Sequence, residues 1–216
     1  MVVREKFESE LKQLKDMVIE LGELAKQSLE ESFSALENQD LEKALEVIED
    51  DNKADLLENE INEQAILLIA KQQPVAIDLR RIIAAIKIAS DIERMADFGV
   101  NVAKSTIRIG NQPFITPITH LKDMQIITLE MIELSLKAFE TEDVLLARKI
   151  AEMDDKVDDL YGESIRDLLQ LTSTNLQQVT QLSFIARYLE RTADHATNIA
   201  ESIYYLVRGR QLDLNE

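Results

Sequence analysis

Residues 93–105 read ERMADFGVNVAKS, and the same pattern returns in residues 190–202 as ERTADHATNIAES. Seven of the 13 aligned positions are identical, at an offset of 97 residues. Residues 14–17 (LKDM) likewise return as residues 121–124. Self-similarity of this kind marks a repeated structural unit. The chain therefore consists of two copies of one unit.

Each copy of this motif lies within a helical pattern, because apolar residues around it recur at spacings of four and three. Breakers divide the whole chain into six such segments: residues 1–38, 40–72, 77–108, 118–139, 143–171 and 175–208. Residues 172–175 (TSTN) form the last turn in this interpretation, and Asp40 caps the second helix. Gly and Pro number only 5 and 3 in 216 residues, too few for the turns of a sheet protein.

These patterns predict an all-α fold of two tandem antiparallel three-helix bundles related by internal duplication, each like a spectrin repeat. The bundles occupy residues 1–110 and 117–216, and residues 110–117 (GNQPFITP), with two of the three prolines, link them. The longest apolar run, residues 65–70, is far shorter than the roughly 20 residues that span a bilayer. With no signal-peptide core at the start, we expect a cytoplasmic protein without membrane insertion.

The charge balance excludes further classes. The chain has 41 acidic and 24 basic residues, a net charge of −17, which argues against nucleic acid or an anionic membrane as a partner. It has no cysteine, so disulfides, thiolate zinc sites and cysteine nucleophiles are excluded. Nothing in the sequence resembles a catalytic constellation or a phosphate loop, and we expect a protein that is not an enzyme.

Carboxylates interrupt the apolar stripes of the helices at matching positions in both copies. Each has a companion one turn later on the same helix face. The four pairs are Asp51/Asp55, Glu93/Asp97, Asp154/Asp158 and Glu190/Asp194. An unpaired carboxylate facing a core is costly, and oxygen-only clusters suit Mg²⁺, Ca²⁺, Mn²⁺ or oxygen-ligated iron. The pairs therefore predict a cation site in each half.

Simpler interpretations compete with a metal site. Most acid pairs in so acidic a chain are solvated surface, and Arg94 and Arg191 offer salt bridges to these acids. Asn101 and Asn198, one turn farther along, could add an amide oxygen or support the ligands, and His195 follows Asp194. The Glu-x-x-His sequence of the di-iron carboxylate bundles is missing, which disfavours a ferritin-like metalloprotein, the main alternative. A plain helical scaffold would fill the core-facing positions with apolar residues.

The motifs at residues 93–97 and 189–201, with residues 73–81 (QPVAIDLRR), closely resemble the PhoU family of phosphate-transport regulators. The resemblance covers essentially the whole chain. It implies multinuclear metal clusters (Fe, Zn, Mg, Mn or Ca) held by the acid-x-x-x-Asp motifs. The first cluster would use Asp51, Asp55, Glu93 and Asp97, and the second Asp154, Asp158, Glu190 and Asp194.

The resemblance also implies a function. Members of the family are non-enzymatic negative regulators in the cytoplasm, and a homodimer is expected. Their partners are the ATPase subunit of the high-affinity phosphate ABC transporter and a phosphate-sensing histidine kinase. The sequence thus resembles that of an adaptor that restrains phosphate uptake when phosphate is plentiful.

Overall fold

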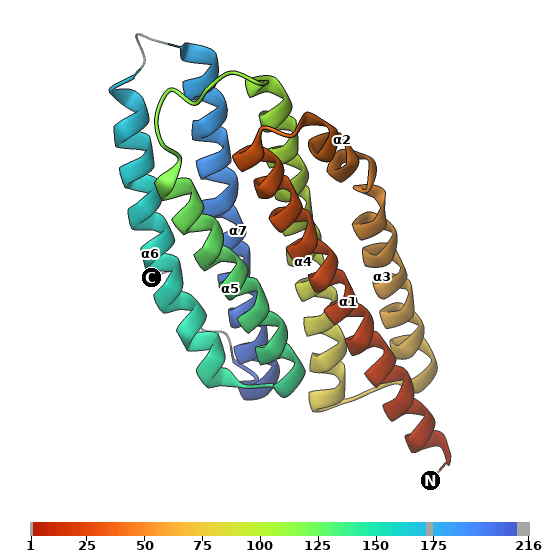
Figure 1. Ribbon diagram of the computed structural model, residues 1–216. Helices are drawn as coiled ribbons and strands as arrows, with labels where there is room; N and C mark the ends of the chain where they lie inside the picture. Colours follow the sequence, from red (N-terminus) through yellow and green to blue (C-terminus); the bar gives the residue numbers. More distant parts are fainter. Residues whose placement is uncertain (1, 172–174, 211–216) are drawn as a thin grey trace.

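The computed structural model describes residues 2–171 and 175–210, which form seven α-helices and no strand (Figure 1). The helices are α1 (Val2–Asn38), α2 (Leu41–Glu49), α3 (Asn52–Gln72), α4 (Ala76–Ile109), α5 (Thr119–Thr141), α6 (Val144–Leu169) and α7 (Leu176–Arg208). The predicted all-α class is confirmed. No helix in the described part of the chain is long and apolar enough to cross a bilayer.

The second predicted helix, residues 40–72, is not continuous. It divides into α2 and α3 at a turn formed by Asp50 and Asp51. Asp and Asn side chains compete for backbone hydrogen bonds and are poor helix formers, and residues 50–52 are Asp-Asp-Asn. One of the candidate site residues, Asp51, thus lies at a helix junction instead of inside a helix.

Side-chain caps fix several helix starts. Asp40 accepts a hydrogen bond from the backbone N–H of Lys43, as the sequence predicts, and Asn175 accepts one from Gln178. Such caps satisfy N–H groups that have no partner in the first turn. Residues 172–174 of the predicted last turn lie outside the described residues.

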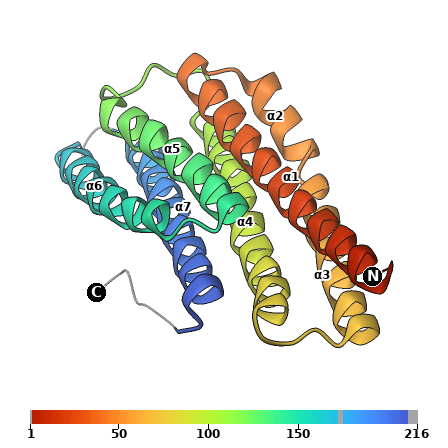
Figure 2. The ribbon, with the colours of Figure 1, turned by 90° about the horizontal axis from the view of Figure 1, so that it is seen from below.

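The seven helices form two adjacent bundles (Figures 1 and 2). Helices α1 to α4 form the first bundle and α5 to α7 the second. The second bundle runs upside down relative to the first, because α1 and α4 ascend in Figure 1 whereas α5 and α7 descend. Helices α1 and α5 lie on the same side of the molecule (Figure 2). The linker between α4 and α5 is held by the Gln178 side chain, which accepts from Ile115 N (2.6 Å) and donates to Pro113 O (3.2 Å).

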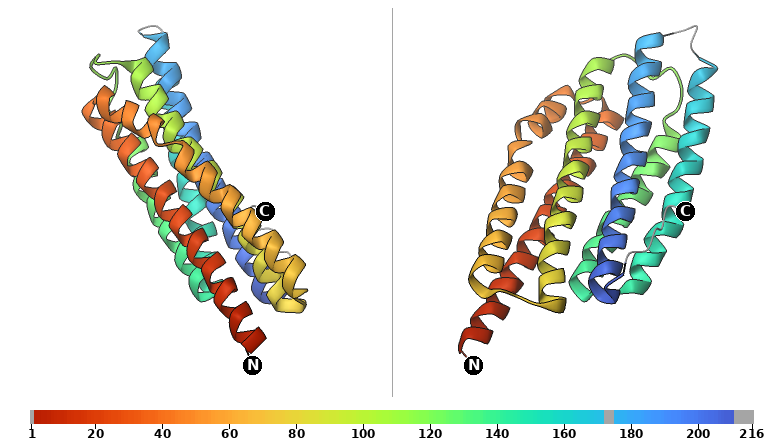
Figure 3. Two further views of the ribbon diagram at one scale, coloured as in Figure 1. Left: turned by 90° about the vertical axis from the view of Figure 1, so that its right-hand side faces the viewer. Right: turned by 180° about the vertical axis from the view of Figure 1, so that it is seen from behind.

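A continuous apolar core joins the two bundles. Helices α4 and α7 run side by side along the middle of the molecule (Figure 3), and their small residues permit close packing. Gly99 of α4 lies against α1, and a Cβ added there would come within 2.9 Å of the Ser28 backbone carbonyl carbon. On the other side, α1 and α5 are linked by ion pairs from Lys26 to Glu133 and from Lys122 to Glu37.

Candidate functional site

Three of the four predicted acids of the first half come together between α3 and α4. One carboxylate oxygen from each of Asp55, Glu93 and Asp97 lies within 4.8 Å of the other two. Asp55 is in the first turn of α3, and the other two are in the middle of α4. The i,i+4 spacing places Glu93 and Asp97 on one face of their helix. This group is referred to below as the first acid cluster.

Asp51 lies at the edge of this cluster. It precedes α3, and it lines a small hollow of about 70 Å³. Burial raises the pKa of its carboxyl group, and Asp97 and Asp55 raise it further, whereas Lys104 acts in the opposite direction. Asp51 is therefore electrically coupled to the first acid cluster. Lys104 was not among the candidate residues predicted from the sequence.

Arg94 provides a cation to the first acid cluster. Its guanidinium group donates a hydrogen bond to Asp97 (3.1 Å) and lies 3.4 Å from Glu93. The salt-bridge interpretation therefore holds in part for this half. The Arg94 side chain is well exposed, so its pair with Asp97 contributes little to stability. Burial and the nearby Asp97 still raise the pKa of Glu93, despite the opposing effect of Arg94.

The equivalent acids of the second half lie between α6 and α7, where Glu190 is buried and Asp158 is exposed. We call Asp154, Asp158, Glu190 and Asp194 the second acid cluster. Glu190 is only 8% exposed. Its Oε2 atom and the Oδ1 atom of Asp154 are buried without a hydrogen-bond partner among the described residues. Buried polar atoms are normally paired, so each unpaired one calls for an explanation, and a bound ion is among the accepted ones.

The electrostatics agree with this geometry. Burial, followed by the charges of Asp158 and Asp194, raises the pKa of Asp154 to about 6. Burial and the charge of Asp194 raise the pKa of Glu190 to about 7, although Arg187 acts in the opposite direction. Burial and mutual repulsion therefore outweigh the effect of Arg187, the cation that lowers the pKa of Glu190. The second acid cluster therefore holds more negative charge than its protein surroundings neutralise.

The arginine beside the second cluster is not the predicted one. Arg187 of α7 forms a short ion pair with Glu190. Arg191, the repeat equivalent of Arg94, lies instead over the ring of Phe98 in α4, 5.1 Å from its centroid. The prediction of a salt bridge from Arg191 is thus replaced by a cation–π contact between the bundles. The spacing of Arg187, three residues before Glu190, was the sequence signal that could have identified it.

His195 and Asn198 face the other bundle. His195 Nδ1 lies 2.8 Å from Asp91 Oδ1, and Asn198 donates to the same oxygen at 3.4 Å. Both side chains therefore contact an acid of α4 that belongs to neither cluster. Asn101, in the first half, is half-buried one turn beyond Asp97.

The donor type of the second acid cluster suits a hard cation, but among the described residues no three of its carboxylates bring oxygens within 4.8 Å of one another, unlike those of the first cluster. Four carboxylates offer oxygen ligands of the kind that Mg²⁺, Mn²⁺, Ca²⁺ and oxygen-ligated iron accept, and two of their oxygens have no partner in the protein. The first acid cluster also fits, with three oxygens grouped and Asp51 nearby. The first half thus has the closer grouping of oxygen ligands, whereas the second half has more buried negative charge that the protein leaves unpaired.

Comparison with known proteins gives the family. A family model described as the PhoU domain matches residues 18–106 and 121–203, one match in each bundle. The chain is 39% identical over 212 residues to a phosphate-specific transport system accessory protein PhoU homolog of Rhizobium meliloti (strain 1021), covering 95% of this chain and 88% of the relative. It is 40% identical over 203 residues to the homolog of Aquifex aeolicus (strain VF5), covering 93% and 92%.

Solved structures agree. The crystal structure of PhoU from Pseudomonas aeruginosa matches with a TM-score of 0.90 and 30% identity, covering 94% of this chain and all of that one. That of the phosphate transport system regulatory protein PhoU from Streptococcus pneumoniae matches with a TM-score of 0.90 and 28% identity, covering 96% and 99%. With both halves matched in sequence and the whole fold matched in structure, the chain belongs to the PhoU family.

Proposed function

We propose that this protein is a non-enzymatic accessory protein of a phosphate-specific transport system and a negative regulator of phosphate uptake. The names of its relatives, which match over nearly the whole chain, support the transport role. In this proposal it works on the cytoplasmic side, as a homodimer, and links the ATPase subunit of the transporter to a phosphate-sensing histidine kinase. In this proposal, nucleic acid is not among its partners.

We propose further that metal ions bound by the two acid clusters prepare the docking surface for these partners. The single observation that supports this most is the pair of buried, unpartnered oxygens of Asp154 and Glu190. When bound, the cations would supply positive charge that neutralises the clustered carboxylates. The carboxylates of α3 with α4, and of α6 with α7, would be the ligands, so each site would tie two helices together.

The test measures metal content and partner binding together. The protein is purified without chelators, and its metals are measured by elemental analysis. Binding to the transporter ATPase subunit is then measured with and without EDTA. We expect E93Q/D97N and E190Q/D194N each to lose metal, and the quadruple variant to bind the partner with no remaining sensitivity to EDTA. As a control, E42Q/E46Q removes an exposed i,i+4 acid pair from α2 and should behave like the wild type.

Two outcomes would overturn the proposal. If the quadruple variant keeps its metal, the acid clusters are not the ligands. If the wild type holds metal but binds its partner equally well after EDTA treatment, the metal has no part in docking, as for a ferritin-like storage protein. Failure of the wild type to bind the ATPase subunit under any condition would contradict the transport role itself.

A further inference from the structure

A second site of a different character lies at the end of the molecule where the turn between α5 and α6 meets the end of α7. A cavity of about 790 Å³ opens there. Its lining includes Glu142, Asp143, Arg148, Tyr204, Arg208 and Arg210. None of them belongs to either acid cluster. This cavity is called the arginine pocket below.

The arginines of this pocket form no ion pair with an acid among the described residues. Arg148 of α6 and Arg208 of α7 are exposed, and neither makes an ion pair within residues 2–171 and 175–210. Arg210 donates a hydrogen bond to the Tyr204 hydroxyl oxygen at 3.2 Å, which is a neutral partner. Three guanidinium groups from two segments therefore line one cavity without a bound counter-charge, in a protein whose net charge is −17.

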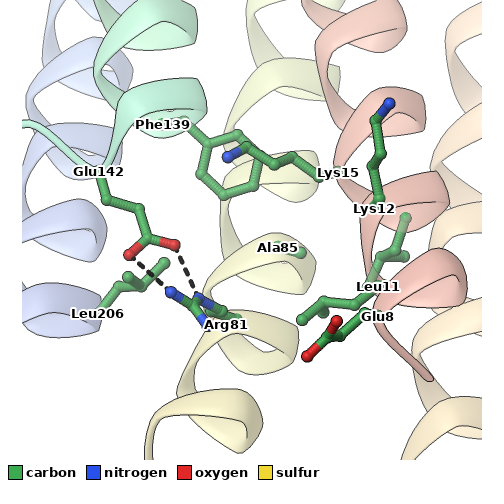
Figure 4. A pocket seen from close by; sticks show the side chains of 10 residues that line it. Glu8, Leu11, Lys12, Lys15, Arg81, Ala85, Phe139, Glu142 and Leu206 are labelled. Carbon is green, nitrogen blue, oxygen red and sulfur yellow. Dashed lines mark hydrogen bonds and ion pairs between the residues drawn. The ribbon is translucent and has the colours of Figure 1, made fainter. Parts of the chain in front are cut away.

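Both acids of the pocket already have partners. Glu142, in the turn between α5 and α6, accepts two hydrogen bonds from Arg81 of α4, at 2.7 and 3.1 Å. Figure 4 shows this bidentate pair. Asp143 caps α6 by accepting from Leu145 N at 2.8 Å. Arg81 therefore neutralises Glu142, and the N-terminus of α6 partly offsets the charge of Asp143. The three arginines of the pocket remain for a ligand.

The end of α7 is fastened to α4, which gives the pocket a firm wall. Arg80 donates from Nε to the carbonyl oxygen of Leu206 at 3.2 Å, and its guanidinium group packs beside Gly209. Gly209 closes the helix with a hydrogen bond to Tyr205 O at 2.8 Å. Arg208 and Arg210 thus lie on either side of an anchored residue. Because this anchoring already restricts the backbone there, ligand binding costs less conformational entropy.

We propose that the arginine pocket binds a small ligand that carries a chain of two or more phosphate groups. Guanidinium groups bind phosphate in a bidentate fork and are favoured where phosphate is recognised. Three of them around one cavity suit several linked anionic groups better than one. The volume lies within the roughly 300–1,000 Å³ typical of small-molecule sites and leaves room beyond a single phosphate ion. This inference does not depend on the proposed docking role of the acid clusters.

The proposal is tested by isothermal titration calorimetry of the full chain with sodium tripolyphosphate. The buffer contains EDTA, so that metal on the acid clusters cannot bridge to the ligand. We expect R148Q/R208Q to bind tripolyphosphate at least tenfold more weakly than the wild type. The control R108Q/R166Q removes two other exposed arginines and changes the net charge equally, and it should bind like the wild type.

The remaining titrations identify the ligand class. Adenosine triphosphate and inorganic phosphate are compared under the same conditions, and we expect both polyphosphates to bind at least tenfold more tightly than inorganic phosphate. Equal affinity for inorganic phosphate would contradict a site for linked phosphates. No heat of binding in the wild type, unchanged binding in R148Q/R208Q, or an equal loss in the control would each overturn the site.

Discussion

His195 of α7 and Asp91 of α4 meet across the boundary between the bundles, with Nδ1 and Oδ1 2.8 Å apart. The repeat equivalents of these two residues are Phe98 and Tyr188, and they also meet, as stacked rings with centroids 6.0 Å apart. The duplicated positions therefore form the same contact twice, once with polar and once with aromatic side chains. Together they hold α4 and α7 in register.

Loss of the polar contact should weaken the fold. In H195A, the mostly buried Asp91 keeps only the long hydrogen bond from Asn198. We expect a loss of about 1–2 kcal/mol in the free energy of unfolding, the cost of leaving a buried acceptor poorly paired. Urea denaturation measures it. H120A is the control, because His120 is more exposed and faces exposed acids, and an equal loss in both variants would contradict the inter-bundle role of His195.

Neutralising Glu190 should stabilise the metal-free protein and weaken metal binding. Glu190 is buried, its Oε2 atom has no partner, and its pKa is raised to about 7. At pH 8 we expect E190Q to gain about 1 kcal/mol in stability without metal, because a buried charge is removed. Its affinity for Mn²⁺ should fall at least tenfold, a typical effect of disturbing a metal site. Titration with Mn²⁺ shows the second effect, and unchanged affinity would exclude Glu190 as a ligand.

The second acid cluster should make the metal-free protein less stable as the pH rises. The folded-state pKa values of Asp154 and Glu190, about 6 and about 7, lie above those of the unfolded chain. Between about pH 4 and pH 7 the folded state therefore binds more protons than the unfolded state, so stability falls as the pH increases through this range. The unfolding midpoint in urea should be lower at pH 8 than at pH 5.

Variants and metal separate this effect from general charge repulsion. D154N/E190Q should show a smaller fall between pH 5 and pH 8 than E42Q/E46Q, which also removes two acids. Mn²⁺ should restore stability at pH 8, because metal binds the deprotonated ligands of the folded state. A fall of equal size in the two double variants would show that the second acid cluster is not the cause.

Gly99 should not tolerate a side chain. A Cβ there would lie 2.9 and 3.0 Å from backbone atoms of Ser28 and Leu29 in α1, and backbone cannot move aside cheaply. We expect G99A to lose about 1–3 kcal/mol in stability, as for overpacked cores. G162A is the matched control, since nothing lies within 4 Å of its Cβ position. It should gain about 0.5–1 kcal/mol from better helix propensity, and thermal unfolding of both variants tests the contrast.

The repeat and the helical periodicity were enough to predict the class of the fold and the ends of most helices. The break at Asp50–Asp51 was missed, because the four-and-three spacing continues through it from Val47 by way of Asp51 to Ala54. The backbone instead follows the local preference of the residues Asp50, Asp51 and Asn52. The capping role of Asp40 was predicted correctly, because a cap depends only on its near neighbours along the chain.

The grouping of Asp55 with Glu93 and Asp97 follows from stripes on two neighbouring helices, so the sequence could predict it. The partners of Arg191 and His195 could not be predicted in this way. They depend on how α4 of one bundle lies against α7 of the other, which is set by packing of the whole core. Glu190 is also more buried than Glu93, although seven of the 13 residues in the two motifs are identical.

The inverted arrangement of the two bundles has a consequence for recognition. Helices α1 and α4 run opposite to α5 and α7, and α1 and α5 lie on the same side of the molecule, so related surfaces of the two halves face that side (Figures 1 and 2). One molecule therefore presents two related faces on one side. A partner with two-fold symmetry of its own can engage both faces at once, and the second contact then forms at a high effective concentration. The internal duplication thus gives a single chain two similar surfaces for recognition.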